Sequence, residues 1–188
     1  YEKGLPAMPS TIYGVGSITK SFTSLSIMIL EEDGRLSIDD YVDSYIPLSI
    51  RPGGERIRIW HLMSHTSGIP ALAYAEAYIR SAVGEVNATW IPISSYEDML
   101  TFLSDAGSWA VAKPGERYFY LNEGYVLLGM IIEKVSGMRY VDFVKRRILE
   151  PLGMMRSFLS RDDVERDGDF ASPYAIDRDG RLVKTPFP

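Results

Sequence analysis

The sequence contains no cysteine among its 188 residues, which excludes a disulfide framework and a thiolate nucleophile. The redox compartment is therefore left open. Glutamine is also absent, and asparagine occurs only at positions 87 and 122. A shortage of such thermolabile residues is typical of thermophilic proteins, but the eight methionines weaken that interpretation.

Long apolar runs and an excess of positive charge are missing too. No run reaches the ~20 apolar residues that a membrane-spanning helix requires, so we expect no membrane span in this chain. The formal net charge is −5 and basic residues form no cluster, which argues against a nucleic-acid partner. With 46% hydrophobic and 24% charged residues, the composition is that of one globular domain with a substantial core.

A glycine-containing stretch at residues 14–16 separates two elements that we expect to be regular. Residues 11–13 predict a short strand, and residues 17–33 predict a helix that ends at Gly34. Apolar side chains point nearly all round this helix, which indicates a buried helix rather than one lying on a surface. At roughly 1.5 Å per residue it would be about 25 Å long, enough to cross a domain.

The first turn of this helix holds the first candidate for chemistry. Ser17 and Lys20 are three residues apart and are therefore neighbours on one helix face. Burial and the positive end of the helix dipole both favour a neutral lysine amine, which could act as the base for a serine nucleophile. Alternatively, Ser17 is only an N-cap and Lys20 is solvated. A phosphate-binding loop would need glycine directly before the lysine, where this chain has Thr19.

The remaining chain is predicted to be mostly helices joined by loops. We expect helices at residues 37–46, 71–83, 95–104, 123–135 and 140–149. Residues 56–59 and 117–121 are expected to be extended, and residues 84–92 to form a loop. From residue 161 onward the chain is charged and has turn signals at 167–168 and 179–180, which fit loops and hairpin strands.

Two histidines, His61 and His65, are four residues apart and would share one face of a short helix. A zinc-protease helix would also need glutamate directly after the first histidine, where this chain has Leu62. We therefore expect no metal site. The favoured interpretation is a short helix that ends in a Thr-Ser-Gly turn, with both histidines hydrogen-bonded in structural roles.

The segment from Tyr120 to Asn122 is the second candidate for chemistry. A tyrosine held beside a lysine at the end of an extended segment could act as a phenolate base. An asparagine amide offers both a donor and an acceptor to a substrate amide. The alternative is structural, with Tyr120 a core aromatic residue and Asn122 the N-cap of the following helix. For Asn122 the two roles can coexist.

Four stretches of the chain together resemble one known superfamily. They are Gly-Ser-Ile-Thr-Lys-Ser-Phe-Thr at 16–23, His-Leu-Met-Ser-His-Thr-Ser-Gly-Ile-Pro at 61–70, Pro-Gly-Glu-Arg-Tyr-Phe-Tyr-Leu-Asn-Glu-Gly-Tyr-Val-Leu-Leu-Gly at 114–129 and Glu-Pro-Leu-Gly-Met at 150–154. In this order they closely resemble the serine β-lactamase and penicillin-binding-protein superfamily. Within it, the chain is most similar to the class C β-lactamase, esterase and D-aminopeptidase branch, and the resemblance covers nearly the whole chain.

The resemblance implies a metal-independent serine hydrolase without a cofactor, acting on an amide, ester or β-lactam bond of a small molecule or peptide. Ser17 matches the acylated nucleophile, and Lys20 matches the lysine of the same motif. Tyr120 matches the tyrosine that moves protons, and Asn122 matches the residue that binds the substrate's side-chain amide. The implied fold is α+β, with an antiparallel sheet flanked by helices and a helical subdomain alongside.

One motif of the superfamily has no good match in this chain. The superfamily carries Lys or His, then Thr or Ser, then Gly on a central strand, and the nearest match is Lys-Thr-Pro at 184–186. Proline is disfavoured in a central strand. We therefore expect residues 1–188 to be a single incomplete domain, mainly helical over about 35–155 and entering the sheet region over 156–188. A complementary chain or segment would then supply the missing sheet, and this piece alone would be catalytically incomplete.

Two further functions stay open at this point. A non-catalytic relative could bind peptides or protein partners through the same pocket. This alternative gains weight if the parent protein lacks the motif of Lys or His, Thr or Ser, and Gly. An isolated helical interaction module would require these 188 residues to fold alone.

Overall fold

The computed structural model describes residues 4, 6–72, 74, 78, 81 and 93–185. Its first elements are η1 (Gly16–Ile18), α1 (Thr19–Glu32), η2 (Val42–Ser44), η3 (Pro52–Gly54), α2 (Ile59–Met63) and α4 (Tyr96–Leu103). They are followed by α5 (Asn122–Ser136), α6 (Tyr140–Val144), η4 (Lys145–Leu149), α7 (Arg161–Asp167), β1 (Tyr174–Ile176) and β2 (Leu182–Lys184). The described part is therefore mostly helical, with one two-stranded sheet.

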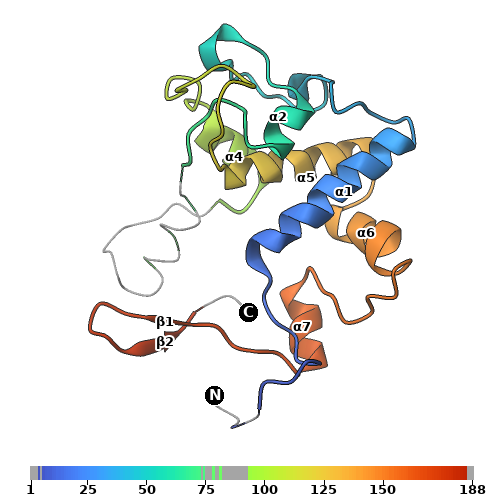
Figure 1. Ribbon diagram of the computed structural model, residues 1–188, viewed down its shortest axis with the longest axis vertical. Helices are drawn as coiled ribbons and strands as arrows, with labels where there is room; N and C mark the ends of the chain where they lie inside the picture. Colours follow the sequence, from blue (N-terminus) through green and yellow to red (C-terminus); the bar gives the residue numbers. More distant parts are fainter. Residues whose placement is uncertain are drawn as a thin grey trace.

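Two long helices, α1 and α5, pack against each other at the centre of the described structure (Figure 1). Helices α2 and α4 pack on α5, and α6 packs on both α1 and α5. The facing side chains have no exposed surface; they include Ile27, Leu30, Leu127, Leu128 and Ile131. Each such side chain contributes about 1.5–3 kcal/mol when it is removed from water. This packing therefore fixes the start of α1 relative to the start of α5.

Helix α1 begins later than predicted and is not buried on all sides. The chain first forms the 3₁₀ turn η1, where Gly16 has a φ of 49° that side chains rarely allow. Gly34 ends the helix as predicted. Leu25 and Met28 are 44% and 41% exposed, so within the described part of this chain α1 is buried on one side only. One side of α1 packs on α5 and α6, while the side with these two residues stays exposed.

The helices expected at residues 95–104, 123–135 and 140–149 are confirmed. The hydroxyl of Ser95 accepts a hydrogen bond from the Asp98 N–H and caps α4. Gly137 ends α5 in the left-handed conformation. The third of these helices consists of α6 and the π-helical turn η4. The helix expected at 71–83 and the loop expected at 84–92 lie largely outside the described residues.

The helix expected at residues 37–46 is wrong, because only the 3₁₀ turn η2 forms there. The Asp40 carboxylate accepts hydrogen bonds from the Ser37 N–H at 2.8 Å and from the Tyr45 hydroxyl at 2.5 Å. Such a side chain gives the local backbone an alternative to helical hydrogen bonds. The segment is a loop, and Tyr41 forms an isolated antiparallel bridge with Arg58 of the extended stretch before α2.

The C-terminal part contains α7 and the hairpin of β1 and β2, which are drawn on opposite sides of the lower half of Figure 1. Helix α7 occupies a charged segment for which the sequence predicts only loops and strands. The Ser160 hydroxyl caps it by accepting the Asp163 N–H. The hairpin closes around the predicted turn at 179–180. The strand expected at 11–13 is reduced to one parallel bridge between Ile12 and Phe170.

Candidate active site

Ser17 and Lys20 meet where η1 passes into α1. The ammonium Nζ of Lys20 donates a hydrogen bond to Ser17 Oγ at 3.1 Å. Ser17 is exposed and Lys20 is half-buried. The interpretation of Ser17 as a plain N-cap is wrong, because Ile18 occupies that position and the Ser17 hydroxyl contacts other side chains. Local helical geometry alone brings these two side chains together.

Tyr120 reaches the same hydroxyl from the segment that precedes α5. Its O–H donates to Ser17 Oγ at 2.6 Å, although the two residues are 103 positions apart. Lys20 Nζ lies 4.8 Å from the centroid of the Tyr120 ring, so the ammonium also faces this aromatic system. Tyr120 is therefore not merely a core aromatic residue, because its polar end is directed at Ser17.

Asn122 is the first residue of α5, but its side chain does not cap that helix. The N-cap residue is Leu121, and no side-chain hydrogen bond caps this end. Asn122 Oδ1 accepts a hydrogen bond from Lys20 Nζ at 2.7 Å instead. The predicted capping role is therefore wrong. The asparagine links α5 to α1, and Lys20 donates to Asn122 and Ser17 at once.

A second tyrosine, Tyr125 of α5, holds the helices around Lys20. The Lys20 Nζ lies 5.5 Å from the centroid of the Tyr125 ring. The Tyr125 hydroxyl donates to the Met63 carbonyl at 2.8 Å and lies 3.1 Å from Ser24 Oγ. Through this one hydroxyl, α5 is connected to the end of α2 and to α1. The position of Lys20 therefore depends on three helices.

His65 lies beside Tyr120 and was expected only to be hydrogen-bonded structurally. Helix α2 ends at Met63, so His65 does not share a helix face with His61, contrary to the prediction. It is the one non-glycine residue with a positive φ, 59°, among the described residues. Its Nδ1 accepts the Leu121 N–H at 3.1 Å. Burial, and then the charge of Lys20, lower the pKa of His65, which keeps the imidazole neutral at pH 7.

His61 has the structural hydrogen bond that the sequence predicts. Its Nδ1 accepts the Arg58 N–H at 2.9 Å, at the start of α2. Burial and the nearby Arg58 charge lower the pKa of His61. Across the described residues, no group of three or more His, Cys, Asp or Glu side chains could hold a metal ion. No helix in the described part of the chain is both long and apolar enough to cross a bilayer.

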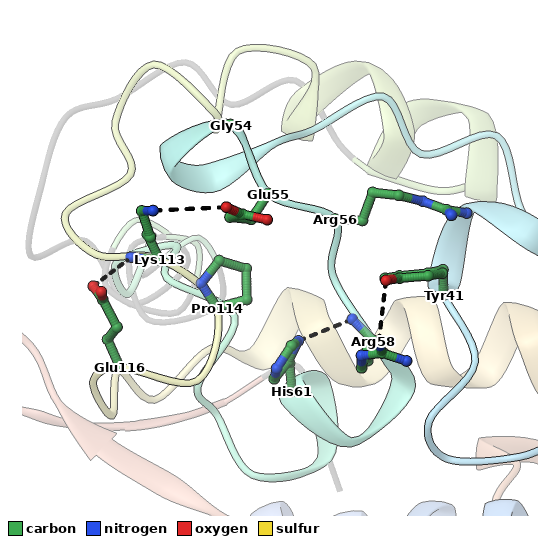
Figure 2. Close-up of a pocket in the computed structure, with 9 residues that line it drawn as sticks. All are labelled: Tyr41, Gly54, Glu55, Arg56, Arg58, His61, Lys113, Pro114 and Glu116. Atoms are coloured by element: carbon green, nitrogen blue, oxygen red, sulfur yellow. Dashed lines mark hydrogen bonds and ion pairs between the residues drawn. The ribbon is translucent and has the colours of Figure 1, made fainter.

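A surface pocket of about 520 Å³ lies beside His61 (Figure 2). It is lined by Tyr41, Gly54, Glu55, Arg56, Arg58, His61, Lys113, Pro114 and Glu116. Two of its cationic side chains are already paired, Arg56 with Asp43 at 2.5 Å and Lys113 with Glu55 at 3.6 Å. The lining includes none of the side chains around Ser17 Oγ. The pocket is therefore separate from the candidate active site.

Sequence comparison places this arrangement among known proteins. The profile of the Beta-lactamase family matches residues 1–188. Penicillin-binding protein 4* of Bacillus subtilis (strain 168) is 36% identical over 176 residues. The match covers 92% of this chain and 36% of that protein, so the chain spans about a third of the length of this relative.

Comparison with solved structures agrees with the sequence match. The octameric penicillin-binding protein homologue from Pyrococcus abyssi is 55% identical with a TM-score of 0.92, over 99% of this chain and 41% of that chain. A D-stereospecific amidohydrolase from Streptomyces sp. is 28% identical with a TM-score of 0.65, over 90% of this chain and 51% of that chain. The described helices correspond to the helical portion of a β-lactamase and transpeptidase-like fold. Because the family profile matches residues 1–188, the chain belongs to the Beta-lactamase family.

Proposed function

We propose that this chain carries the nucleophilic centre of a serine hydrolase that forms an acyl-enzyme on Ser17. The observation that supports this most is the double contact of Ser17 Oγ, 3.1 Å from Lys20 Nζ and 2.6 Å from the Tyr120 hydroxyl. A serine hydroxyl needs an adjacent base to become nucleophilic, and two titratable groups adjoin this oxygen. Membership of the Beta-lactamase family supports a hydrolase of this type.

The proposed reaction starts from the form of the site in which Tyr120 or Lys20 has first lost one proton to solvent. The Ser17 hydroxyl proton then moves to the Tyr120 phenolate or to the Lys20 amine. Ser17 Oγ then bonds to the carbonyl carbon of the substrate, and the carbonyl oxygen becomes an oxyanion. The first N–H groups of a helical turn lack an intrahelical acceptor, which supports the Ser17 N–H as one donor to that oxyanion. Tyr120 protonates the leaving group as its bond to carbon breaks, and the acyl group stays on Ser17.

Hydrolysis of the acyl-enzyme completes the proposed cycle. Water gives one proton to the tyrosine and lysine pair and bonds to the acyl carbon, after which Ser17 Oγ leaves and recovers a proton. The 2.7 Å hydrogen bond from Lys20 to Asn122 supports a role for Asn122 in orienting the lysine. We assign Asn122 the additional role of binding an amide of the substrate, since its side chain combines a donor and an acceptor. The cycle requires no cofactor.

The proposed substrates are amides, esters or β-lactams of small molecules or peptides. Each presents a carbonyl carbon that a serine oxygen can attack. The relatives described as a penicillin-binding protein and as a D-stereospecific amidohydrolase support this carbonyl chemistry. The contacts around Ser17 Oγ do not favour one of these three substrate types over the others. We therefore propose the chemical class of the cleaved bond and no single compound.

We also propose that a complementary chain or segment covers the exposed side of α1. Ile18 at the end of η1 exposes 62% of its surface, and Leu25 and Met28 of α1 expose 44% and 41%. Exposed apolar side chains that gather on one surface are typical of a site that another element covers. The same segment would extend the sheet that residues 156–188 enter, beside the helical part at about 35–155. It would also bring the motif of Lys or His, Thr or Ser, and Gly to the Ser17 hydroxyl.

Covalent labelling of the longer protein that contains this chain tests the proposed nucleophile. The protein is treated with a fluorophosphonate and, separately, with a labelled penicillin, and the modified residue is located by mass spectrometry. We expect one label on Ser17 and none in the Ser17→Ala variant. The matched control is Ser21→Ala, an exposed serine one turn further along α1, which should label like the parent protein.

Two outcomes would contradict the proposal. A label that persists on Ser17→Ala would show that the nucleophile lies elsewhere. Absence of label from the folded parent protein, with binding of peptides retained, would favour the non-catalytic relative instead. Circular dichroism of both variants confirms that a loss of label does not arise from unfolding.

A further inference from the structure

Tyr120 is held on both sides by a single residue, His65. The residue before Tyr120 donates its Phe119 N–H to the His65 carbonyl at 2.8 Å. The residue after Tyr120 donates its Leu121 N–H to the His65 imidazole Nδ1 at 3.1 Å. Two hydrogen bonds from one residue therefore fix the backbone of the segment that directs the Tyr120 hydroxyl at Ser17.

The ring of His65 also contacts the ring that it positions. The centroids of His65 and Tyr120 lie 4.4 Å apart with an interplanar angle of 35°. The centroid of the Tyr125 ring, in α5, lies 5.1 Å from the centroid of the imidazole ring. His65 is 9% exposed, and its φ of 59° is a conformation that non-glycine residues keep only when the surrounding contacts require it. The imidazole is therefore a packed part of the wall behind Tyr120.

The hydrogen bond to Leu121 requires one protonation state of the imidazole. An imidazole nitrogen accepts a hydrogen bond only when it carries no proton, so His65 is neutral and protonated at Nε2. The titratable groups that face it are Lys20 from α1, Tyr125 from α5, and Tyr118 and Tyr120 from the segment before α5. Protonation of Nδ1 would break the bond to Leu121 and place a second positive charge near Lys20.

We infer that His65 is a positioning residue. Neutral His65 holds the Tyr120 hydroxyl against Ser17, and protonation of its Nδ1 releases the segment that contains Tyr120. This inference rests on the proposed acyl-transfer function of Ser17. It adds a regulatory property to that function, since the centre loses activity on the acid side because its tyrosine is no longer held. His65 itself does not contact the reacting atoms and acts through Tyr120.

Two substitutions distinguish the effect of the hydrogen bond to Leu121 from the effect of protonating His65. Both are made in the longer protein that contains this chain. His65→Asn keeps an acceptor near the position of Nδ1 and tolerates a positive φ, but it has no proton to gain in this pH range. His65→Ala removes the acceptor and the stacked ring. The rate of Ser17 phosphonylation by a fluorophosphonate, with loss of fluoride, and the kcat and KM for a chromogenic ester are measured from pH 4.5 to 8.5.

We expect His65→Ala to lower kcat by about 100-fold with a small change in KM, because misplacement of a reacting group by about 1 Å can cost this factor. His65→Asn should keep kcat at pH 8 within about 10-fold of the parent protein. Its activity should lose the acid limb that the parent protein shows below the ordinary histidine pKa of about 6.5, where a histidine with a lowered pKa titrates. His61→Asn is the matched control, since His61 also has a bonded Nδ1 but bonds to Arg58, and it should retain the acid limb.

An acid limb in His65→Asn that matches the parent protein would overturn the inference, as would an unchanged kcat in folded His65→Ala. If His65→Ala does not fold, the pH profile of His65→Asn decides the question alone. Ser17→Ala is measured in parallel. Activity that survives in Ser17→Ala rejects the proposed function itself, whereas an inactive Ser17→Ala with unaffected His65 variants rejects only the role of His65.

Discussion

Lys20 contacts residues of both long helices in the candidate centre. Its ammonium donates to Ser17 and Asn122 and faces the rings of Tyr120 and Tyr125. The spacing of three residues predicts only the contact with Ser17. The other contacts come from residues about a hundred positions away and need the packing of α5 against α1. Sequence periodicity therefore predicts only the contact between Ser17 and Lys20, which are close in the chain.

Asp40 and its hydrogen-bond partners make the stability of the loop at residues 37–46 depend on pH. The Tyr45 hydroxyl and the Ser37 N–H lower the pKa of Asp40, while burial and the same contact raise the pKa of Tyr45 to about 12. Because the pKa of Asp40 is lowered on folding, its contribution is present above the unfolded pKa of about 3.9 and is lost as pH falls through the folded value.

We therefore expect Asp40→Asn to lower the free energy of unfolding at pH 7 by about 1.5–3 kcal/mol, the value of one hydrogen bond to a charged group. The difference from the parent protein should shrink below about pH 4. Urea unfolding at pH 7, 5 and 3 measures it. Asp39→Asn, an exposed neighbour, should change the same free energy by less than about 0.5 kcal/mol. A constant difference between pH 7 and pH 3 would contradict the electrostatic origin.

At the scale of elements, the crossing of α1 and α5 decides where the functional groups lie. Helix α5 begins at Asn122 and α1 contains Lys20, so any shift between the two helices lengthens the 2.7 Å bond between them. The buried aliphatic residues of both helices resist such a shift, since protein interiors are closely packed. One glycine inside α5 and one directly after its last residue allow the stability of this helix to be changed without touching the site.

The two positions differ in backbone conformation, and the same substitution should have opposite effects. Gly129 lies within α5, where an added Cβ would meet Tyr140 at 3.9 Å and Tyr96 at 4.0 Å, both ordinary contacts. Gly129→Ala should stabilise the protein by about 0.5–1 kcal/mol. Gly137 has a φ of 71° at the helix end, and Gly137→Ala should destabilise it by about 1 kcal/mol. Thermal unfolding of both variants measures the difference, and a shift of the same sign in both would reject this explanation.

At the scale of the whole molecule, α1 and the hairpin both leave apolar side chains exposed. The two-stranded hairpin pairs with no other strand among the described residues, and Ile176 of β1 is 61% exposed. The chain spans 36% of the length of penicillin-binding protein 4*. Whether a complementary segment covers α1 can therefore be tested by making the same substitution in the 188-residue chain and in the longer protein that contains it.

We expect the double variant Leu25→Lys, Met28→Lys to have little effect on the melting temperature of the 188-residue chain, because both side chains are already partly exposed. In the longer protein that contains it, the same change should cost about 2–4 kcal/mol, since two covered apolar side chains become charged. Differential scanning calorimetry of the four proteins gives the comparison. Equal shifts of the melting temperature in the 188-residue chain and in the longer protein would show that nothing covers this side of α1.

The sequence by itself determined the helices whose periodicity and caps agree, as in α4 and α5, and the pairing of Ser17 with Lys20 inside one turn. It also carried the resemblance that assigned Tyr120 and Asn122 to the same site. It failed at residues 37–46, where side-chain hydrogen bonds to Asp40 replace helical ones. Only the tertiary structure decided that Asn122 bonds to Lys20 instead of capping α5, and that His65 holds both neighbours of Tyr120. The physical reason is that these contacts join residues about 55 to 100 positions apart, and their geometry follows from helix packing, which no local pattern encodes.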